Sequence, residues 1–257
     1  MRAAAVTLLA TLLIATPLVG CGGDDRGDGA GGASASSGGA TGPGPGVGAG
    51  GPGACGTSEL RTGEATYYDF ADGSGNCGFE PSPEDLRVAA MNHTDYAGSA
   101  ACGACARVIG PNGEITVRIV DQCPECPAGD IDLSPEAFSQ IAALEAGRVP
   151  IEWEYVPCAV EGPVIYHFKE GSNEWWTAVQ IRNHRYAIAD VAYQAADGSF
   201  VSVPREDYNY FVEASGMGPG PYTFRLTDDN GQTLEDTGIE HVEAGDVPGS
   251  AQFGDCD

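Results

Sequence analysis

Basic residues are scarce in this chain. Its 257 residues include 12 lysines and arginines, against 37 aspartates and glutamates, which gives a formal net charge of −25. A chain with so few cations cannot neutralise a run of phosphates, so binding of nucleic acid through a basic face is excluded. Electrostatic docking onto anionic lipid is disfavoured for the same reason.

Long apolar runs are also scarce. The run 3–18 follows Arg2 and is too short and too weakly bounded for a stable membrane span, so it predicts a secretory signal and an exported protein. It ends in Leu18-Val19-Gly20-Cys21, which is similar to a bacterial lipobox. That similarity implies cleavage before Cys21 and a lipid anchor on its thiol. An ordinary signal peptide with a chance cysteine is the alternative.

Large apolar residues are almost absent from the next segment, which consists mainly of Gly, Ala, Ser and Pro. Such a composition cannot form a core and predicts a flexible tether. We therefore expect a signal peptide at 1–20, a tether at 21–56, and two globular domains at 57–158 and 159–257.

Eight cysteines remain after Cys21, at positions 55, 77, 102, 105, 123, 126, 158 and 256. An even number in an exported chain predicts a disulfide framework. Two Cys-x-x-Cys pairs also have the spacing of a zinc ribbon or of a redox site. Export favours disulfides, so we expect no metal and no cofactor.

The two halves of the chain differ in their patterns. The first predicts strands at 64–68, 106–110, 114–120 and 149–156. It also predicts one helix, with Ser134 as N-cap and Pro135 at its first position, running to about Leu144. The second half predicts only strands, with turns at Asp197-Gly198 and Asn230-Gly231, as in a small β-sandwich. Its expected strands are 164–168, 176–181, 187–193, 200–203, 222–226 and 232–234.

Several short motifs occur in a fixed order in both halves. In the first half they are Gly63-Glu64-Ala65-Thr66-Tyr67-Tyr68, Gly75-Asn76-Cys77-Gly78-Phe79, Ala101-Cys102-Gly103-Ala104-Cys105, Val120-Asp121 and Asp130-Ile131-Asp132-Leu133-Ser134-Pro135. In the second half they are Lys169-Glu170-Gly171-Ser172-Asn173-Glu174-Trp175-Trp176, Gln180-Ile181-Arg182-Asn183-His184 and Asp207-Tyr208-Asn209-Tyr210-Phe211. Over about 57–257 the chain thereby resembles bacterial expansin-like proteins. The resemblance implies a mainly β fold, with a six-stranded double-psi β-barrel followed by an immunoglobulin-like β-sandwich.

The resemblance also implies a cleft in the first domain. Thr66, Asp121 and Asp132 match the residues of the cleft floor, and Asp132 matches the acid on which wall loosening depends. Without the resemblance, Asp132 could equally be a carboxylate that stabilises the start of the following helix. Cys123 departs from the bacterial pattern, which tends to place a tyrosine there.

Asp69 is a second departure. The cleft also resembles that of small inverting endoglucanases, in which a second aspartate after a similar strand activates water. Asp69 could supply that base, with Asp132 as acid, if the carboxylates lie roughly 6.5–9.5 Å apart. The simpler interpretation, which we favour, is a surface loop rich in Asp.

In the second domain, Trp175, Trp176 and Tyr208 match a flat aromatic row that binds cellulose, and Lys169 matches a polar contact beside it. Adjacent residues of a strand face opposite sides, which argues against Trp176 sharing a surface with Trp175. The preceding Glu170-Gly171-Ser172-Asn173 indicates a loop or strand entry, where this alternation can fail. This domain has 5 basic and 17 acidic residues, so acidic polymers should bind poorly and neutral glucan well.

Four disulfides are expected. Family spacing implies the first two of the following pairs, adjacency the third and elimination the fourth: Cys77–Cys102, Cys105–Cys158, Cys123–Cys126 and Cys55–Cys256.

The function implied is binding of cell-wall polysaccharide, chiefly cellulose or a related β-glucan, and loosening of the wall without hydrolysis. We expect a monomer that contacts membrane only through its lipid anchor. Two alternatives stay open: a glycoside hydrolase using Asp132 and Asp69, and a lipoprotein that acts on peptidoglycan in the manner of a lytic transglycosylase.

Overall fold

The computed structural model describes residues 58–69 and 71–256. The expected signal peptide, Cys21, the tether and Cys55 lie outside the described residues, so the lipid anchor and the Cys55–Cys256 pair stay predictions. All described elements belong to one unit, Ala49–Asp257. Within the described part of the chain, no helix is long and apolar enough to cross a membrane.

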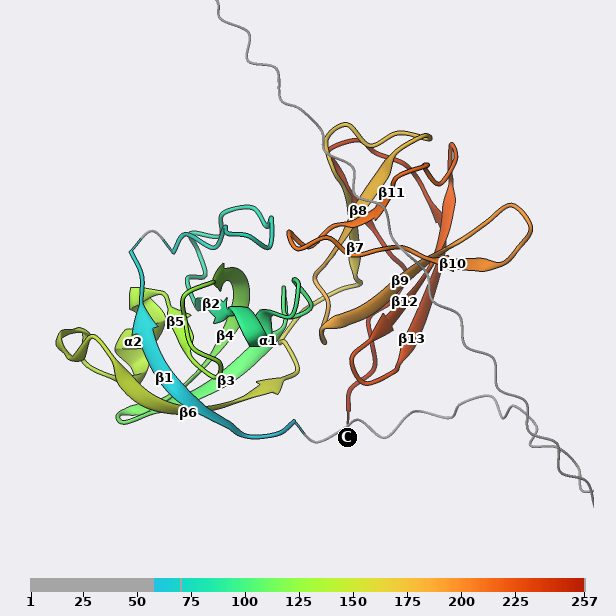
Figure 1. Cartoon of the computed structure of the whole chain (residues 1–257). Coiled ribbons are helices and arrows are strands. Elements are labelled where there is room, and N and C mark those ends of the chain that lie inside the picture. The colour runs from blue at the N-terminus through green and yellow to red at the C-terminus, as the bar shows by residue number, and fades with distance from the viewer. Residues whose placement is uncertain (1–57, 70, 257) are drawn as a thin grey trace, which may run out of the picture. The chain divides into compact units, whose positions relative to one another are not determined.

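The first six strands close into a barrel in the order β1-β5-β2-β4-β3-β6 (Figure 1). They are β1 (Arg61–Tyr67), β2 (Val88–Asn92), β3 (Cys105–Gly110), β4 (Gly113–Cys123), β5 (Ile131–Leu133) and β6 (Val149–Val156). The pairs β1–β5 and β2–β4 are parallel, and the other neighbours are antiparallel. The six-stranded barrel expected from the family resemblance is confirmed.

The barrel core is filled by large apolar side chains, among which Phe138 and Trp153 are fully buried. Phe138 belongs to α2 (Pro135–Ile141), which has Ser134 as N-cap and Pro135 at its start, as predicted. The prediction that this helix reaches Leu144 is wrong. It ends at Ile141 because Ala142 adopts extended backbone, and the backbone N–H of Asn112 takes the carbonyl of Ile141 at 2.9 Å.

A short helix and two strands of the barrel, β2 and the three-residue β5, were not expected from the sequence. The helix α1 (His93–Tyr96) directly follows β2, and a single 3₁₀ turn (Leu144–Ala146) follows α2. All five residues of β2 are buried, so this strand has no apolar–polar alternation that could reveal it.

The second half forms two four-stranded antiparallel sheets, in the orders β10-β9-β12-β13 and β11-β8-β7-β14. The strands are β7 (Ile165–Phe168), β8 (Thr177–Arg182), β9 (Ile188–Gln194), β10 (Phe200–Ser202), β11 (Phe211–Glu213), β12 (Tyr222–Asp228), β13 (Thr233–Ile239) and β14 (Asp246–Pro248). Tyr166 and Phe224 stack in its core, with ring centroids 5.0 Å apart. The predicted β-sandwich is confirmed, although the three-residue strands β11 and β14 were missed.

Three disulfides join described residues: Cys77–Cys102, Cys105–Cys158 and Cys123–Cys126. They are the pairs that family spacing and adjacency imply. Because Cys102 and Cys105 bond to different partners, they do not act together as a zinc or redox pair.

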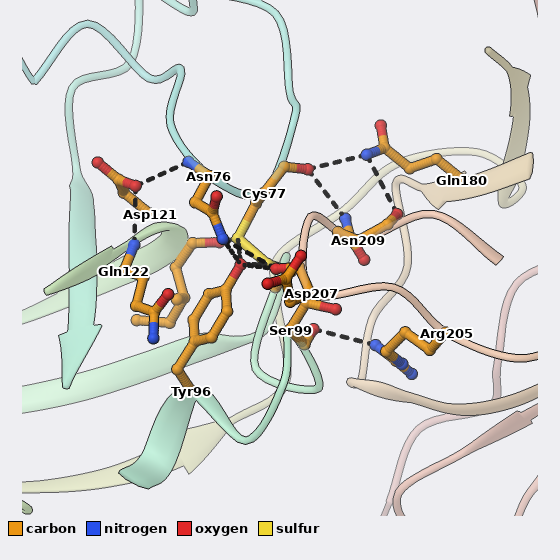
Figure 2. The surroundings of a disulfide bond; sticks show 12 residues. Asn76, Cys77, Tyr96, Ser99, Asp121, Gln122, Gln180, Arg205, Asp207 and Asn209 are labelled. Carbon is orange, nitrogen blue, oxygen red and sulfur yellow. Dashed lines mark hydrogen bonds between the residues drawn. A yellow bond between two sulfur atoms is a disulfide. The ribbon is translucent and has the colours of Figure 1, made fainter. Parts of the chain in front are cut away.

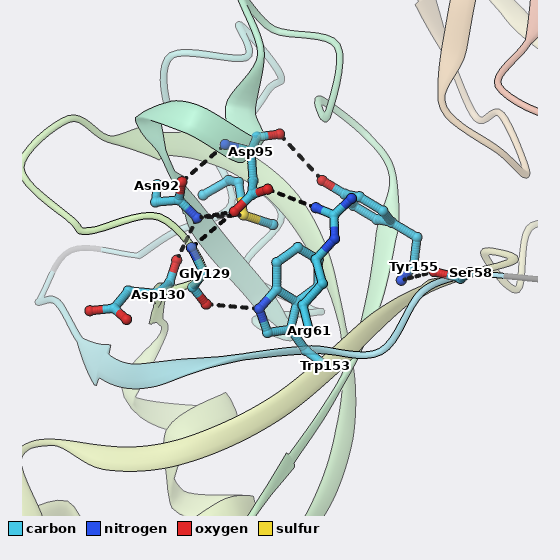
Figure 3. A network of polar contacts seen from close by, with 9 residues as sticks. Ser58, Arg61, Asn92, Asp95, Gly129, Asp130, Trp153 and Tyr155 are labelled. Atoms are coloured by element: carbon cyan, nitrogen blue, oxygen red, sulfur yellow. Dashed lines mark hydrogen bonds and ion pairs between the residues drawn. The ribbon is translucent and has the colours of Figure 1, made fainter.

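A polar network fixes the loop that leads into β5 (Figure 3). Asp95 accepts hydrogen bonds from Arg61 at 2.7 Å and from the backbone N–H of Gly129 at 3.0 Å. The indole N–H of Trp153 donates to the carbonyl of Gly129 at 2.8 Å. Gly63 packs against the same carbonyl, because a Cβ at position 63 would stand 2.1 Å from its oxygen. The network therefore fixes the loop that precedes β5, the strand that carries Asp132.

Candidate binding cleft and aromatic turn

Strand pairing brings the predicted cleft residues into one row. Thr66 of β1 is the register partner of Asp132 of β5, and Ala90 of β2 pairs with Asp132 on one side and with Asp121 of β4 on the other. The row therefore runs Thr66, Asp132, Ala90, Asp121 across four neighbouring strands. Ala90 leaves the space between the two aspartates free of a large side chain.

Asp132 is held by a short hydrogen bond and is half-buried. The hydroxyl of Thr66 donates to its carboxylate at 2.5 Å. Burial raises the pKa of Asp132, the hydrogen bond from Thr66 opposes that rise, and the negative charge of Glu125 adds to it. A partly exposed carboxyl group with a raised pKa can hydrogen-bond sugar hydroxyls as acceptor or, when protonated, as donor.

Asp121 is fixed by backbone donors. Its Oδ1 accepts from the backbone N–H of Asn76 at 2.7 Å and of Gln122 at 2.8 Å. Gly75 packs directly against it, and a Cβ there would stand 2.5 Å from the Asp121 Cβ and Cγ atoms. The carboxylate is thus oriented by the backbone of the 75–76 turn.

Tyr68 lies within the influence of Asp121 and Asp132, although it was not predicted as a site residue. Its hydroxyl is buried and has no hydrogen-bond partner among the described residues. Burial raises its pKa, and the charges of Asp121 and Asp132 raise it further. A buried donor without a partner costs stability.

Asp69 is not part of this row of residues on paired strands. It is exposed in the turn after β1, and no hydrogen bond or ion pair joins it to another described residue. By contrast, Cys123 is buried at the end of β4, and its bond to Cys126 closes the loop that carries Glu125.

Trp175 stands on a tight turn of the sandwich and is 72% exposed. Asn173 and Trp176 exchange backbone hydrogen bonds, and the Asn173 side-chain oxygen accepts from the N–H of Trp175 at 2.9 Å and of Trp176 at 3.2 Å. Both tryptophans therefore precede β8, which begins at Thr177. Strand alternation does not apply to them, and Trp176 is half-exposed. We call Asn173–Trp176 the tryptophan turn.

Gly216 packs against the backbone of the tryptophan turn. Gly216 has φ +77°, and a Cβ there would stand 2.0 Å from the carbonyl oxygen of Glu174 and 2.5 Å from Cα of Trp175. The backbone N–H of Gly218 donates to the same carbonyl at 3.1 Å. The position of Trp175 thus depends on a segment about 40 residues further along the chain.

Tyr208 and Lys169 meet around a third aromatic residue. Tyr208 is half-exposed, and its ring centroid lies 5.9 Å from that of buried Tyr210. The ammonium group of Lys169 lies 5.3 Å from the Tyr210 ring centroid. Tyr210 was not predicted as a site residue, because nothing in the sequence shows that it contacts both Tyr208 and Lys169.

A hydrogen-bond relay joins the cleft to the segment that carries Tyr208 (Figure 2). The carbonyl of Asp207 accepts from the Asn76 side chain and from the Tyr96 hydroxyl, each at 2.8 Å. The backbone N–H of Asn76 binds Asp121. One residue, Asn76, therefore contacts both a cleft acid and the neighbour of Tyr208.

A closed barrel that carries Asp132 and Asp121 in one row, joined to a β-sandwich with an exposed tryptophan turn, defines a β-barrel and β-sandwich protein suited to binding a polysaccharide. A family model described as "Lytic transglycolase" matches residues 61–153, the barrel. Expansin-YoaJ of Bacillus subtilis is 36% identical over 204 residues, which cover 76% of this chain and 87% of that protein. Expansin-like protein 1 of Dictyostelium discoideum is 32% identical, over 70% of this chain and 66% of that protein.

Solved structures give the same result. A mutant of the Clavibacter michiganensis expansin, crystallised in complex with cellohexaose, matches with a TM-score of 0.72 and 32% identity, over 77% of this chain and 99% of that chain. The apo form of that expansin matches equally well. The chain belongs to the expansin family, and it is a bacterial expansin-like protein.

Proposed function

We propose that this protein binds cellulose or a closely related β-glucan and loosens the wall without cutting the glucan. The observation that carries the proposal is Trp175, whose indole is 72% exposed. Its turn is held by hydrogen bonds from the backbone N–H groups of Asn173, Trp175 and Trp176. The faces of glucose rings are apolar, and a rigid aromatic ring stacks on them at low entropic cost. The similar expansin in complex with cellohexaose supports the same class of ligand.

Non-hydrolytic action is supported by how the carboxylates are held. An inverting hydrolase needs a base fixed opposite the acid so that it can orient water. Asp69 is exposed and no described residue holds it, while Asp121 has one oxygen bound to two backbone N–H groups. Asp132 and Thr66 then act as hydrogen-bonding groups that bind a glucan strand and compete with its neighbours.

The test is a pull-down on microcrystalline cellulose, with isolated peptidoglycan and chitin as competing matrices, combined with extension of wall strips under load. We expect binding to cellulose and no release of reducing sugar. Asp132→Asn should keep cellulose binding and abolish loosening. Binding to peptidoglycan alone would contradict the proposal, and reducing sugar that vanished in Asp132→Asn or Asp69→Ala would show hydrolysis instead.

We also propose export with a lipid on Cys21, a tether to about residue 56, domains at 57–158 and 159–257, and a monomeric state. Detergent-phase partitioning of the wild type and of Cys21→Ser tests the anchor. Partitioning of the wild type into the aqueous phase would overturn it. Sedimentation at two concentrations tests the monomeric state.

A further inference from the structure

A second recess lies between the barrel and the end of β8, and neither the cleft nor the tryptophan turn contributes to it. Its volume is about 660 Å³, within the range of small-molecule sites. Arg87 and Arg118 line it from the barrel, Arg182 and His184 line it from the sandwich, and Phe79 also lines it. We call it the arginine pocket. Two carboxylates, those of Glu80 and Asp85, line it as well, so the three guanidinium groups exceed the acids at this recess in a chain with a net charge of −25.

Arg118 has no carboxylate of its own. Its guanidinium donates one hydrogen bond, at 3.3 Å to the Ser82 hydroxyl, and among described residues it makes no ion pair. The nearby Asp85 is held by Arg87 through two bonds of 2.8 Å, which occupy both carboxylate oxygens. Burial lowers the pKa of Arg118, which shows that its charge is poorly solvated. A partly buried guanidinium without an anion is costly unless a ligand supplies one.

Arg182 brings a second positive charge from the opposite wall. Its Nε donates to Gln180 at 2.6 Å, and an ion pair of 3.4 Å joins it to Asp246. These contacts fix the side chain, which is largely buried. The pocket therefore contains two different cations. Arg182 is fixed by these contacts, and Arg118 makes no ion pair with a described residue.

His184 supplies an acceptor rather than a third charge. It is buried, and its Nδ1 lies 2.7 Å from the carbonyl of Tyr186, so Nδ1 carries the proton and Nε2 is left as the acceptor. Burial lowers the pKa of His184 to about 4, so the ring is neutral at pH 7. Gly103, another lining residue, packs closely against the imidazole ring, because a Cβ there would stand 2.5 Å from Nε2, so any larger residue at 103 would cover that acceptor.

The remaining lining favours a compact ring with one apolar side. The Phe79 ring centroid lies 5.4 Å from the Arg118 guanidinium carbon, and the partly exposed Val160 adds a second apolar group, with Val88 and Val117 buried behind them. A free carboxylate such as acetate would satisfy the arginines but would leave both His184 and this wall without contacts. A sugar acid satisfies all three, because it combines a carboxylate, hydroxyl donors and apolar ring hydrogens.

We propose that the arginine pocket binds an acidic sugar of the uronic acid class, with its carboxylate on Arg118 and Arg182 and a hydroxyl donating to His184 Nε2. Guanidinium groups are well matched to carboxylates in charge and geometry. The site is separate from the glucan surface and does not depend on glucan binding. The net charge of −25 repels long polyanions, so the ligand is an isolated acidic residue or a chain end rather than a continuous acidic polymer.

The test is calorimetric and NMR titration of the full chain with glucuronate and galacturonate at low salt. Glucose and galactose are the matched neutral probes, because they carry a hydroxymethyl group where the acids carry the carboxylate. We expect at least tenfold weaker binding of the neutral sugars. Arg118→Gln should weaken uronate binding at least tenfold, whereas Arg107→Gln, whose arginine pairs with Glu154 and Glu114 outside the pocket, should leave it unchanged.

A second variant covers the case in which Arg118→Gln does not fold. Ala159 is an exposed lining residue, so Ala159→Trp should fill the pocket and abolish uronate binding. Equal affinity for acid and neutral sugars would overturn the proposal, as would unchanged uronate binding in Ala159→Trp or in folded Arg118→Gln. Binding of long polyuronate chains in preference to single residues would overturn the assignment to an isolated residue. Cellulose pull-down with the same variants should be unchanged, so failure of this proposal is distinguishable from failure of glucan binding.

Discussion

In the barrel, Thr66 and Asp132 meet although 66 positions separate them, whereas in the sandwich Trp175 is held by Asn173, two positions away. The cleft is half-buried and its geometry comes from the register of four paired strands. The tryptophan turn is exposed and its geometry comes from one side-chain acceptor and one close glycine. Removal of an exposed aromatic side chain at the turn should therefore alter binding with little effect on stability, while changes at the cleft should alter loosening and stability together.

The largest effect is expected for Trp175→Ala. Removing an indole that stacks on glucan loses about 1.5–3 kcal/mol of apolar burial, which corresponds to roughly 10- to 100-fold weaker binding. The side chain is mostly exposed in the free protein, so Tm should stay within about 2 °C of wild type. Depletion isotherms on cellulose and calorimetry measure both quantities.

Val201→Ala is the control for that variant, because Val201 is also an exposed apolar residue of the sandwich but lies on β10. It should bind cellulose like wild type. Equal losses in Trp175→Ala and Val201→Ala would show that the tryptophan turn is not the contact surface.

Gly216→Ala breaks the turn without removing any aromatic group. The added Cβ would stand 2.0 Å from the carbonyl oxygen of Glu174, at a φ of +77°, so the turn must move. We expect several-fold weaker cellulose binding and a loss of about 1–3 kcal/mol of stability from the strained backbone. Gly231→Ala has the same φ with nothing within 4 Å, so it should lose stability but keep binding.

Gly75→Ala is the corresponding change at the cleft. Its Cβ would stand 2.5 Å from the Asp121 side chain and would displace that carboxylate from its backbone donors. We expect wall loosening to fall several-fold while cellulose binding through the tryptophan turn stays unchanged. A parallel fall in both would show that the two surfaces do not act separately.

Asp132→Asn tests the buried carboxylate through pH. Because burial raises its pKa in the folded protein above the ordinary value of 3.8, the ionised form costs stability, and the cost grows as pH rises from about 3.8 through the raised pKa. Asparagine keeps an acceptor for Thr66 and carries no charge. The Tm of the variant should match wild type at low pH and exceed it by a few degrees at most at pH 7. A lower Tm at pH 7 would contradict this account of the cleft.

The sequence predicted the parts of each surface that depend on residue identity, and missed those that depend on close packing. Thr66, Asp121 and Asp132 were found because short motifs surround them. Tyr68 and Tyr210 lie inside such motifs, but only three-dimensional contacts show that one has an unpartnered hydroxyl and the other supports Lys169.

Whether Trp176 shares a surface with Trp175 also depends on local contacts that the sequence does not show. Strand alternation does not apply to a turn capped by the Asn173 side chain, and β8 itself has five buried residues in succession. Gly216 could not have been connected with Trp175, because nothing in the sequence pairs segments about 40 residues apart. The buried strand β2 was missed because it lacks alternation, and it is the strand that places Asp121 beside Asp132.

The smallest effect is expected for Asp69→Ala. Asp69 is exposed and no described residue holds it, so its removal should change neither Tm, cellulose binding nor wall loosening beyond experimental error. Asp72→Ala is a useful comparison, because Asp72 lies in the same loop and accepts hydrogen bonds from the backbone N–H and hydroxyl of Ser74. That loss should lower Tm slightly without affecting binding. If instead Asp69→Ala reduced loosening as much as Asp132→Asn does, the cleft would need two carboxylates, and its similarity to a hydrolase would extend to mechanism.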